Sequence, residues 1–225
     1  MNSSEKSLKS HNMKWLCALI ALDVVLLLTL AFPSALDTAT STRMLVARLG
    51  VATLLPVVVL LLSALVSPNA KAVLVYWRLK DTLPGHRAFT THAAADTRID
   101  LGALRNNVGV FPEDPRDQNS LWYKLYTKVA SETAVQESHK SYLLFRDIAV
   151  VSLLIAAAAP IAWLLVGASA AAATTAVALM GGQYVLAAIA ARNSGVRFVT
   201  NVLAVHSTKR VIRATPSQTM AKKQA

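Results

Sequence analysis

The sequence predicts an all-α membrane protein with four transmembrane helices and a mainly helical cytosolic insertion between the second and third helix. Three observations predict this fold. Apolar runs with few charges, long enough to cross a bilayer, recur along the chain. Of the 225 residues, 54% are hydrophobic and only 16% are charged, which is less charge than soluble domains usually carry. Most of the basic residues lie between the apolar runs rather than within them.

The first two spans are expected to form a transmembrane hairpin over residues 15–66, after a polar cytosolic tail at 1–14. The first span covers 15–32 and follows three lysines. A cleaved signal peptide is the less favoured interpretation, because the run is long and a second apolar run follows it closely. That second span covers 44–66.

The insertion covers residues 67–146 and carries helix signals. Ser67 and Pro68 are typical of a helix start, and that helix is expected to end near Pro84. A short helix is expected from Asp100. Helical spacing predicts one apolar face for Trp122, Leu125, Tyr126 and Val129. A further helix should run from about residue 131 into the third span without a break.

The third and fourth spans form a second hairpin over 147–191, followed by a basic cytosolic tail at 192–225. The fourth span is rich in Ala, Thr and Gly, which favours close packing at the centre of the bundle. The start of the tail has apolar residues at helical spacing, which predicts an amphipathic helix on the membrane surface. These residues are Val196, Val199, Val202 and Leu203.

The distribution of cations predicts the orientation. The net charge is +11, the insertion holds eleven Lys and Arg residues, and the tail has no acidic residue. With four crossings, all strongly basic segments fall on one side, which should be the cytoplasmic side of a plasma membrane, presumed to be a bacterial inner membrane. Anionic lipid headgroups are the expected partner of the tail, and nucleic acid is not expected. The expected headgroup contacts are Arg192, Arg197, Lys209, Arg210 and Arg213.

Two charged residues fall within the first hairpin. Asp23 lies about 13 Å deep in the first span and Arg48 about 6 Å deep in the second, at 1.5 Å per residue. A lone charge at such a depth is costly, so an ion pair between Asp23 and Arg48 is predicted. A structural link between the two helices is the favoured interpretation, and an element of an ion or proton path is the alternative.

A polar and glycine-rich stretch is expected to interrupt the fourth span at mid-depth. Gly181, Gly182 and Gln183 could mark unwound backbone that lines a pore. Close helix packing is the commoner cause of such glycines and is the preferred interpretation.

The insertion also concentrates polar and aromatic residues that could bind a small molecule or a protein. Ordinary helix caps and surface ion pairs are the alternative interpretation. The candidates are His86, Arg87, Asp96, Arg98, Asp100, Gln118, Asn119, Trp122 and Tyr123. No phosphate-binding glycine loop, zinc motif or recognisable catalytic set is present, so no cofactor, metal or enzymatic activity is expected.

The layout resembles that of small four-helix membrane effectors of bacterial defence systems, which pair a helical bundle with a cytosolic sensing part. The resemblance covers architecture only, and no motif carries it. The charged pair, the small-residue fourth helix and the large insertion suggest a regulated effector or channel-like module, with homo-oligomers expected. A non-conducting scaffold or accessory subunit is the alternative, and a membrane-bound enzyme is the third hypothesis.

Overall fold

The computed structural model describes residues 3–31, 61, 63–166 and 169–208, and all of their regular elements are helical. Three helices are long and apolar enough to cross a membrane. They are α1 (Ser3–Ala31), α7 (Thr133–Val166) and α8 (Ala170–Thr208). Most of the predicted second span lies outside the described residues, so the finding of three helices does not test whether that span exists.

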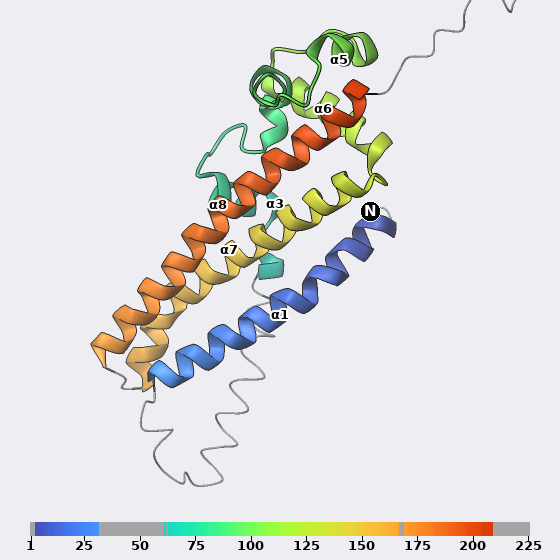
Figure 1. The fold of residues 1–225 in the computed structure, drawn as a ribbon. Coiled ribbons are helices and arrows are strands. Elements are labelled where there is room, and N and C mark those ends of the chain that lie inside the picture. The colour runs from blue at the N-terminus through green and yellow to red at the C-terminus, as the bar shows by residue number, and fades with distance from the viewer. Residues whose placement is uncertain (1–2, 32–60, 62, 167–168, 209–225) are drawn as a thin grey trace, which may run out of the picture.

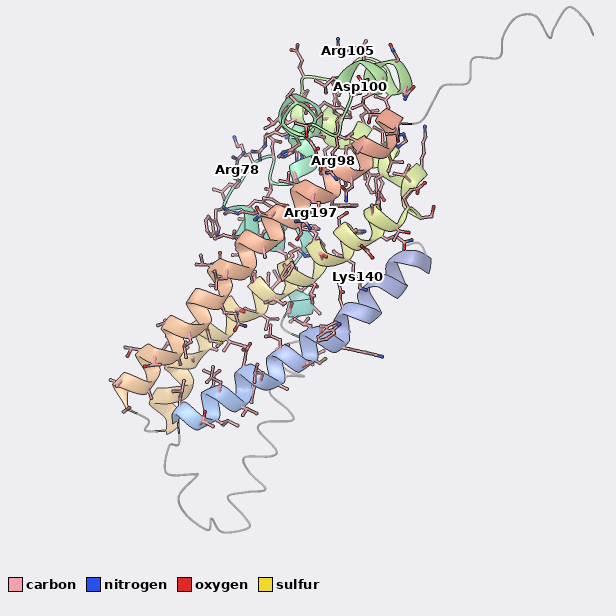
Figure 2. The ribbon with its side chains drawn as sticks, in the orientation of Figure 1. Arg78, Arg98, Asp100, Arg105, Lys140 and Arg197 are labelled. Atoms are coloured by element: carbon pink, nitrogen blue, oxygen red, sulfur yellow. The ribbon has the colours of Figure 1, made fainter. Side chains whose placement is uncertain are left out.

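The three long helices run side by side (Figure 1). The beginning of α1, the beginning of α7 and the end of α8 lie at one end of the molecule, where the shorter helices also gather. We call this end the cap and the opposite part, formed by the three long helices, the bundle. The labelled residues Arg78, Arg98 and Arg105 lie at the cap end (Figure 2). These three arginines all belong to the insertion, and the orientation of the chain in a membrane stays a prediction.

Short helices build most of the cap. They are α3 (Pro68–Tyr76), the 3₁₀ turn η2 (Pro84–Arg87), the π-helical turn η3 (Ala88–His92), α4 (Ala93–Ala95), α5 (Leu101–Val108) and α6 (Pro115–Val129). Ser67 caps α3 by accepting from the Ala70 N–H, and Asp100 caps α5 by accepting from the Ala103 N–H. Both helix starts were predicted. The end of α3 was not, because Trp77 takes a left-handed conformation (φ 53°) that stops the helix.

Three apolar cores follow one another along the molecule. The bundle core includes Ile20, Val24, Val151 and Met180. A junction core of small residues joins α3 to α7 and α8 through Val75, Ala149, Ala187, Ala188 and Ala191. The cap core packs the predicted apolar face of α6 against α8. Both α7 and α8 contribute to all three cores, so they connect the bundle to the cap.

The prediction of a separate surface helix after residue 191 is wrong. α8 continues unbroken for 39 residues, or about 58 Å, roughly twice the apolar thickness of a bilayer. Val199, Val202 and Leu203 are fully buried in the cap core rather than turned toward lipid. The period of the pattern marked a buried face correctly. The spacing alone does not indicate that the aromatic face of α6, rather than the membrane, covers this face of α8.

Candidate functional site

One polar cluster lies inside the bundle, with one residue from each long helix. The Gln183 side-chain amide on α8 donates to an Asp23 carboxylate oxygen on α1 at 2.9 Å, and to the Ser152 hydroxyl oxygen on α7 at 3.0 Å. Ser152 in turn donates to the Ile148 carbonyl, which leaves its oxygen able to accept. Asp23 is 3% exposed and Ser152 is fully buried. A single amide nitrogen therefore uses both of its hydrogens to join three helices.

This geometry bears on two predictions for the bundle. Arg48 lies outside the described residues, so the proposed ion pair with Asp23 stays a prediction, while Gln183 is a partner that the sequence did not suggest. The expected interruption at Gly181 and Gly182 is absent, because α8 is helical through both. A Cβ at either glycine would meet no described atom within 4 Å, so neither is a point of close packing among the described helices.

An apolar groove runs beside this cluster. Its volume is about 640 Å³, and it lies between α1, α7 and α8, where Leu19, Phe145 and Leu186 line it. Gln183 and the small Gly182 also face it. The polar cluster is thus reached from an apolar surface of the bundle.

An aromatic and arginine cluster joins α3 to α8 at the junction. Trp77 donates through its indole N–H to the Tyr184 hydroxyl at 2.7 Å, and that hydroxyl donates to the Leu74 carbonyl at 2.7 Å. Arg192 donates to the Val75 carbonyl at 2.6 Å and lies 3.6 Å from the Trp77 ring centroid. Trp, Tyr and Arg at one level are typical of the boundary between apolar and polar membrane layers.

A second, charged cluster of the junction joins α3 to α7. The Lys71 ammonium lies 3.0 Å from an Asp147 carboxylate oxygen, and the Arg146 guanidinium lies 3.1 Å from the same oxygen. Lys71 also donates to the Ser63 hydroxyl. The three charged side chains are only 11–17% exposed. One carboxylate therefore balances two mostly buried cations, which makes it difficult to replace.

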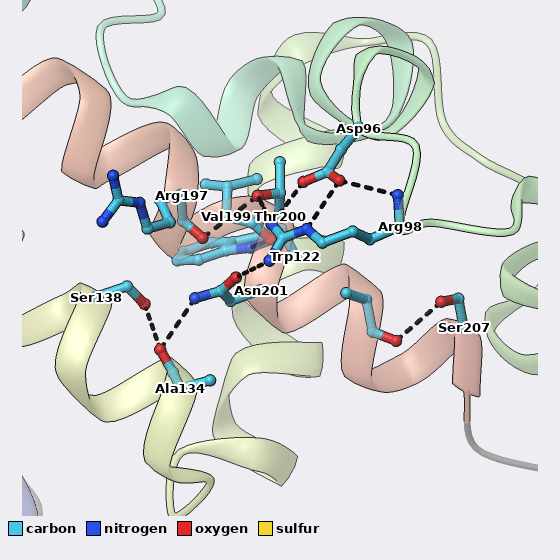
Figure 3. A network of polar contacts seen from close by, with 11 residues as sticks. Asp96, Arg98, Trp122, Ala134, Ser138, Arg197, Val199, Thr200, Asn201 and Ser207 are labelled. Carbon is cyan, nitrogen blue, oxygen red and sulfur yellow. Dashed lines mark hydrogen bonds and ion pairs between the residues drawn. The ribbon is translucent and has the colours of Figure 1, made fainter.

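A third network ties the cap segments to α8 (Figure 3). Arg98 makes a two-point contact with Asp96, at 2.7 and 3.0 Å, and donates to Thr200 and Asn201 on α8 at 3.1 Å each. Asn201 donates onward to the Ala134 carbonyl at the start of α7. Hydrogen bonds from Arg98 hold the pKa of the Asp96 carboxyl well below its ordinary value.

The remaining predicted cap residues separate into different environments. Gln118 is buried, and its amide binds the Phe89 and Thr90 N–H groups and the Glu113 carbonyl. Trp122 is buried and packs edge-on against Phe198. These contacts give Gln118 and Trp122 structural roles.

The others lie nearer the surface. Asp100 is the cap of α5, and Tyr123 is exposed. Asn119 lies against Gly85, where a Cβ would overlap its side-chain oxygen. The His86 ring lies 3.1 Å from the Leu83 carbonyl, and burial, followed by the charge of Arg78, lowers the pKa of Arg87.

Asp96 and Arg98 are brought together with residues that the sequence did not single out. They line an open cavity of about 360 Å³ with His92 from η3 and with Asn193, Arg197 and Thr200 from α8. Arg197 had been predicted as a lipid contact, and its place here does not test that prediction. Among the described residues, no group of three or more His, Cys, Asp or Glu side chains could hold a metal ion.

No protein-family model, curated protein or solved structure matches this chain at a significant level.

Proposed function

We propose that this protein is a multi-pass membrane effector or channel-like module, with four spans, whose cytosolic cap binds a ligand or partner and regulates the bundle. The observation that carries this proposal is the continuity of α7 and α8. Each helix contributes to the bundle core, the junction core and the cap core. A rearrangement of the cap would therefore act directly on helices that reach into the membrane.

The polar cluster of Asp23, Ser152 and Gln183 supports a role for the bundle beyond anchoring. Ionisable residues inside membrane segments are costly and are commonly functional. The orientation that we propose places both termini and the cap in the cytoplasm, in agreement with the positive-inside rule. We propose assembly into homo-oligomers as well, since the apolar faces of α1 and α8 expose large side chains such as Leu22 and Leu186.

The test is membrane potential, measured with a dye in bacterial cells that over-produce the protein. Wild type should depolarise the cells, and Asp23→Asn should alter that depolarisation because it removes the only carboxylate of the polar cluster. Asp117→Asn, an exposed change on α6, is the matched control and should behave as wild type. Equal, undiminished depolarisation by all three proteins would assign Asp23 a structural role. No depolarisation, with the protein confirmed in the membrane, would favour the scaffold or an effector that requires a bound ligand, and would contradict an effector that is active on its own.

Orientation has a separate test. A reporter that is active only outside the cytoplasm, fused after Glu113, should be silent. Activity of that fusion would overturn the cytosolic placement of the cap.

A scaffold or accessory subunit is the second candidate function. Two large apolar side chains of the cap, Leu79 and Val110, are each 88% exposed, which suits docking of a protein partner. A scaffold should be harmless when over-produced and should lose its partner on Leu79→Ser or Val110→Ser. We propose no enzymatic activity.

A further inference from the structure

The open cavity at the cap end of α8 has two walls that come from distant parts of the sequence. Asp96 and Arg98 follow α4 and form one wall with His92, while Asn193, Arg197 and Thr200 form the other. The volume of about 360 Å³ is at the lower end of the range for small-molecule sites. Because the two walls belong to different segments, a ligand between them would bridge the cap to α8.

The cavity carries an excess of positive charge. Its one carboxylate, Asp96, is already bonded at two points to Arg98. That leaves the Arg197 guanidinium on its lining without an acidic neighbour there. Arg87 and Arg78 lie close enough that, after burial, their charges are the further causes lowering the pKa of His92. An anion in this cavity would meet a favourable potential.

The donors are available and partly held in place. Among the described residues the Arg197 guanidinium has no hydrogen-bonding or ionic partner, and Figure 3 shows it directed away from the Asp96–Arg98 pair, on the far side of Thr200. Arg98 is fixed by Asp96, Thr200 and Asn201, which leaves its guanidinium plane preorganised. Four of the five Arg98 N–H groups are used in these contacts, so most donors for a group with several acceptor oxygens would come from Arg197.

The level of the cavity relative to the membrane suggests where such a group comes from. Trp77, Tyr184 and Arg192 mark the boundary of the apolar layer. Arg197 follows Arg192 by five residues of α8, or about 7.5 Å along the axis. The headgroup layer of a bilayer is about 5–7 Å thick on each side. The cavity therefore opens at the outer edge of the headgroup layer, which both lipid phosphates and soluble phosphates can reach.

We propose that this cavity binds a terminal phosphate group, with Arg197 and His92 as the contacts that recognise it and Arg98 as the fixed opposite rim. The proposal rests on the proposed function and names the ligand class of the cap. The lining includes no Phe, Tyr or Trp ring on which a nucleobase could stack, so the phosphate itself is the recognised group. Bound phosphate would tie the Asp96–Arg98 segment to α8 and so stabilise one arrangement of the cap on the bundle.

The experiment uses the full chain in nanodiscs and reads the midpoint of thermal unfolding during titration. One arm adds phosphatidic acid to phosphatidylcholine discs. A second arm adds glycerol 3-phosphate, the soluble form of the same headgroup, to discs of phosphatidylcholine alone. Arg197→Gln should weaken binding about tenfold or more, as expected for a lost charge-assisted hydrogen bond. Lys124→Gln is the matched control, because Lys124 is exposed on α6, which contributes nothing to the cavity.

The outcomes distinguish a lipid phosphate, a soluble phosphate and the absence of a phosphate site. Stabilisation in the first arm only, weakened by Arg197→Gln and not by Lys124→Gln, assigns a lipid phosphate. Stabilisation in the second arm as well, with the same mutant pattern, assigns a phosphate that also comes from solution. No stabilisation in either arm overturns the proposal, and so does equal weakening by the two variants. None of these results depends on depolarisation, so a failure here is distinguishable from a failure of the proposed function.

Discussion

Polar contacts join the helices in both the bundle and the cap, but they are buried in the bundle and partly exposed in the cap. In the bundle, one amide links α1, α7 and α8 through two hydrogen bonds to nearly inaccessible atoms. In the cap, Arg98 makes several contacts while its side chain remains 56% exposed. Water can replace a lost contact in the cap, but nothing polar in a membrane interior can do so. Few contacts in the bundle and junction should therefore matter more than many in the cap.

The largest effect is expected at the junction. Asp147→Ala leaves Lys71 and Arg146 as mostly buried cations without their carboxylate. Removal of one partner from a buried ion pair typically costs about 3–5 kcal/mol. The measurement is thermal unfolding of the purified protein in detergent.

A double substitution sharpens that expectation. Lys71→Met combined with Asp147→Leu should recover part of the lost stability, because Lys71 no longer remains as an unpaired buried cation, whereas Arg146 still lacks its carboxylate. A cost for Asp147→Ala no greater than that of the exposed change Asp117→Asn would show that water reaches this cluster, and would weaken the contrast with the cap.

The next largest effect is expected inside the bundle. Gln183→Leu removes the shared donor and leaves Asp23 and Ser152 without it, at a cost of about 1–3 kcal/mol for unsatisfied buried groups. Gln183→Asn is the informative comparison, because its amide is too short to reach both partners. Equal stability of Gln183→Leu and wild type, in the same unfolding assay, would mean that Asp23 has another partner that dominates.

Features that depend on local sequence could be predicted better than contacts between distant helices. Helix starts at Ser67 and Asp100 and the apolar face of α6 follow from local spacing, and the structure confirms them. The Gln183 cluster depends on the register between three helices, and Ser152 resembles any serine in an apolar run. The path of α8 beyond residue 191 was missed for a related reason. Helical spacing marks a buried face, but it does not identify the surface that covers it.

An effect of similar size is expected where α3 approaches α8. A Cβ at Gly195 would overlap the Tyr76 hydroxyl and press on the Tyr142 ring, so Gly195→Ala should destabilise by about 1–3 kcal/mol. Gly182→Ala is the matched control on the same helix. Its Cβ meets no described atom within 4 Å, so it should be neutral or stabilise by about 0.5–1 kcal/mol.

The cause can be separated from helix propensity by a second change. Tyr76→Phe removes the overlapping oxygen and should relieve part of the Gly195→Ala cost. Identical unfolding midpoints for Gly195→Ala and Gly182→Ala would argue against a close approach of α3 to α8.

The smallest effect is expected in the cap, and it should depend on pH. The Arg98 hydrogen bonds hold the folded-state pKa of Asp96 well below the ordinary value of 3.8. Its stabilisation is therefore fully present above about pH 4 and is lost as the pH falls through the folded-state pKa. Since Arg98 is largely exposed, Asp96→Asn should cost less than about 1 kcal/mol at neutral pH. The difference between the thermal unfolding midpoints of wild type and Asp96→Asn should become smaller as the pH is lowered below 4. A gap that stays constant with pH would mean that packing, not charge, holds this segment to α8.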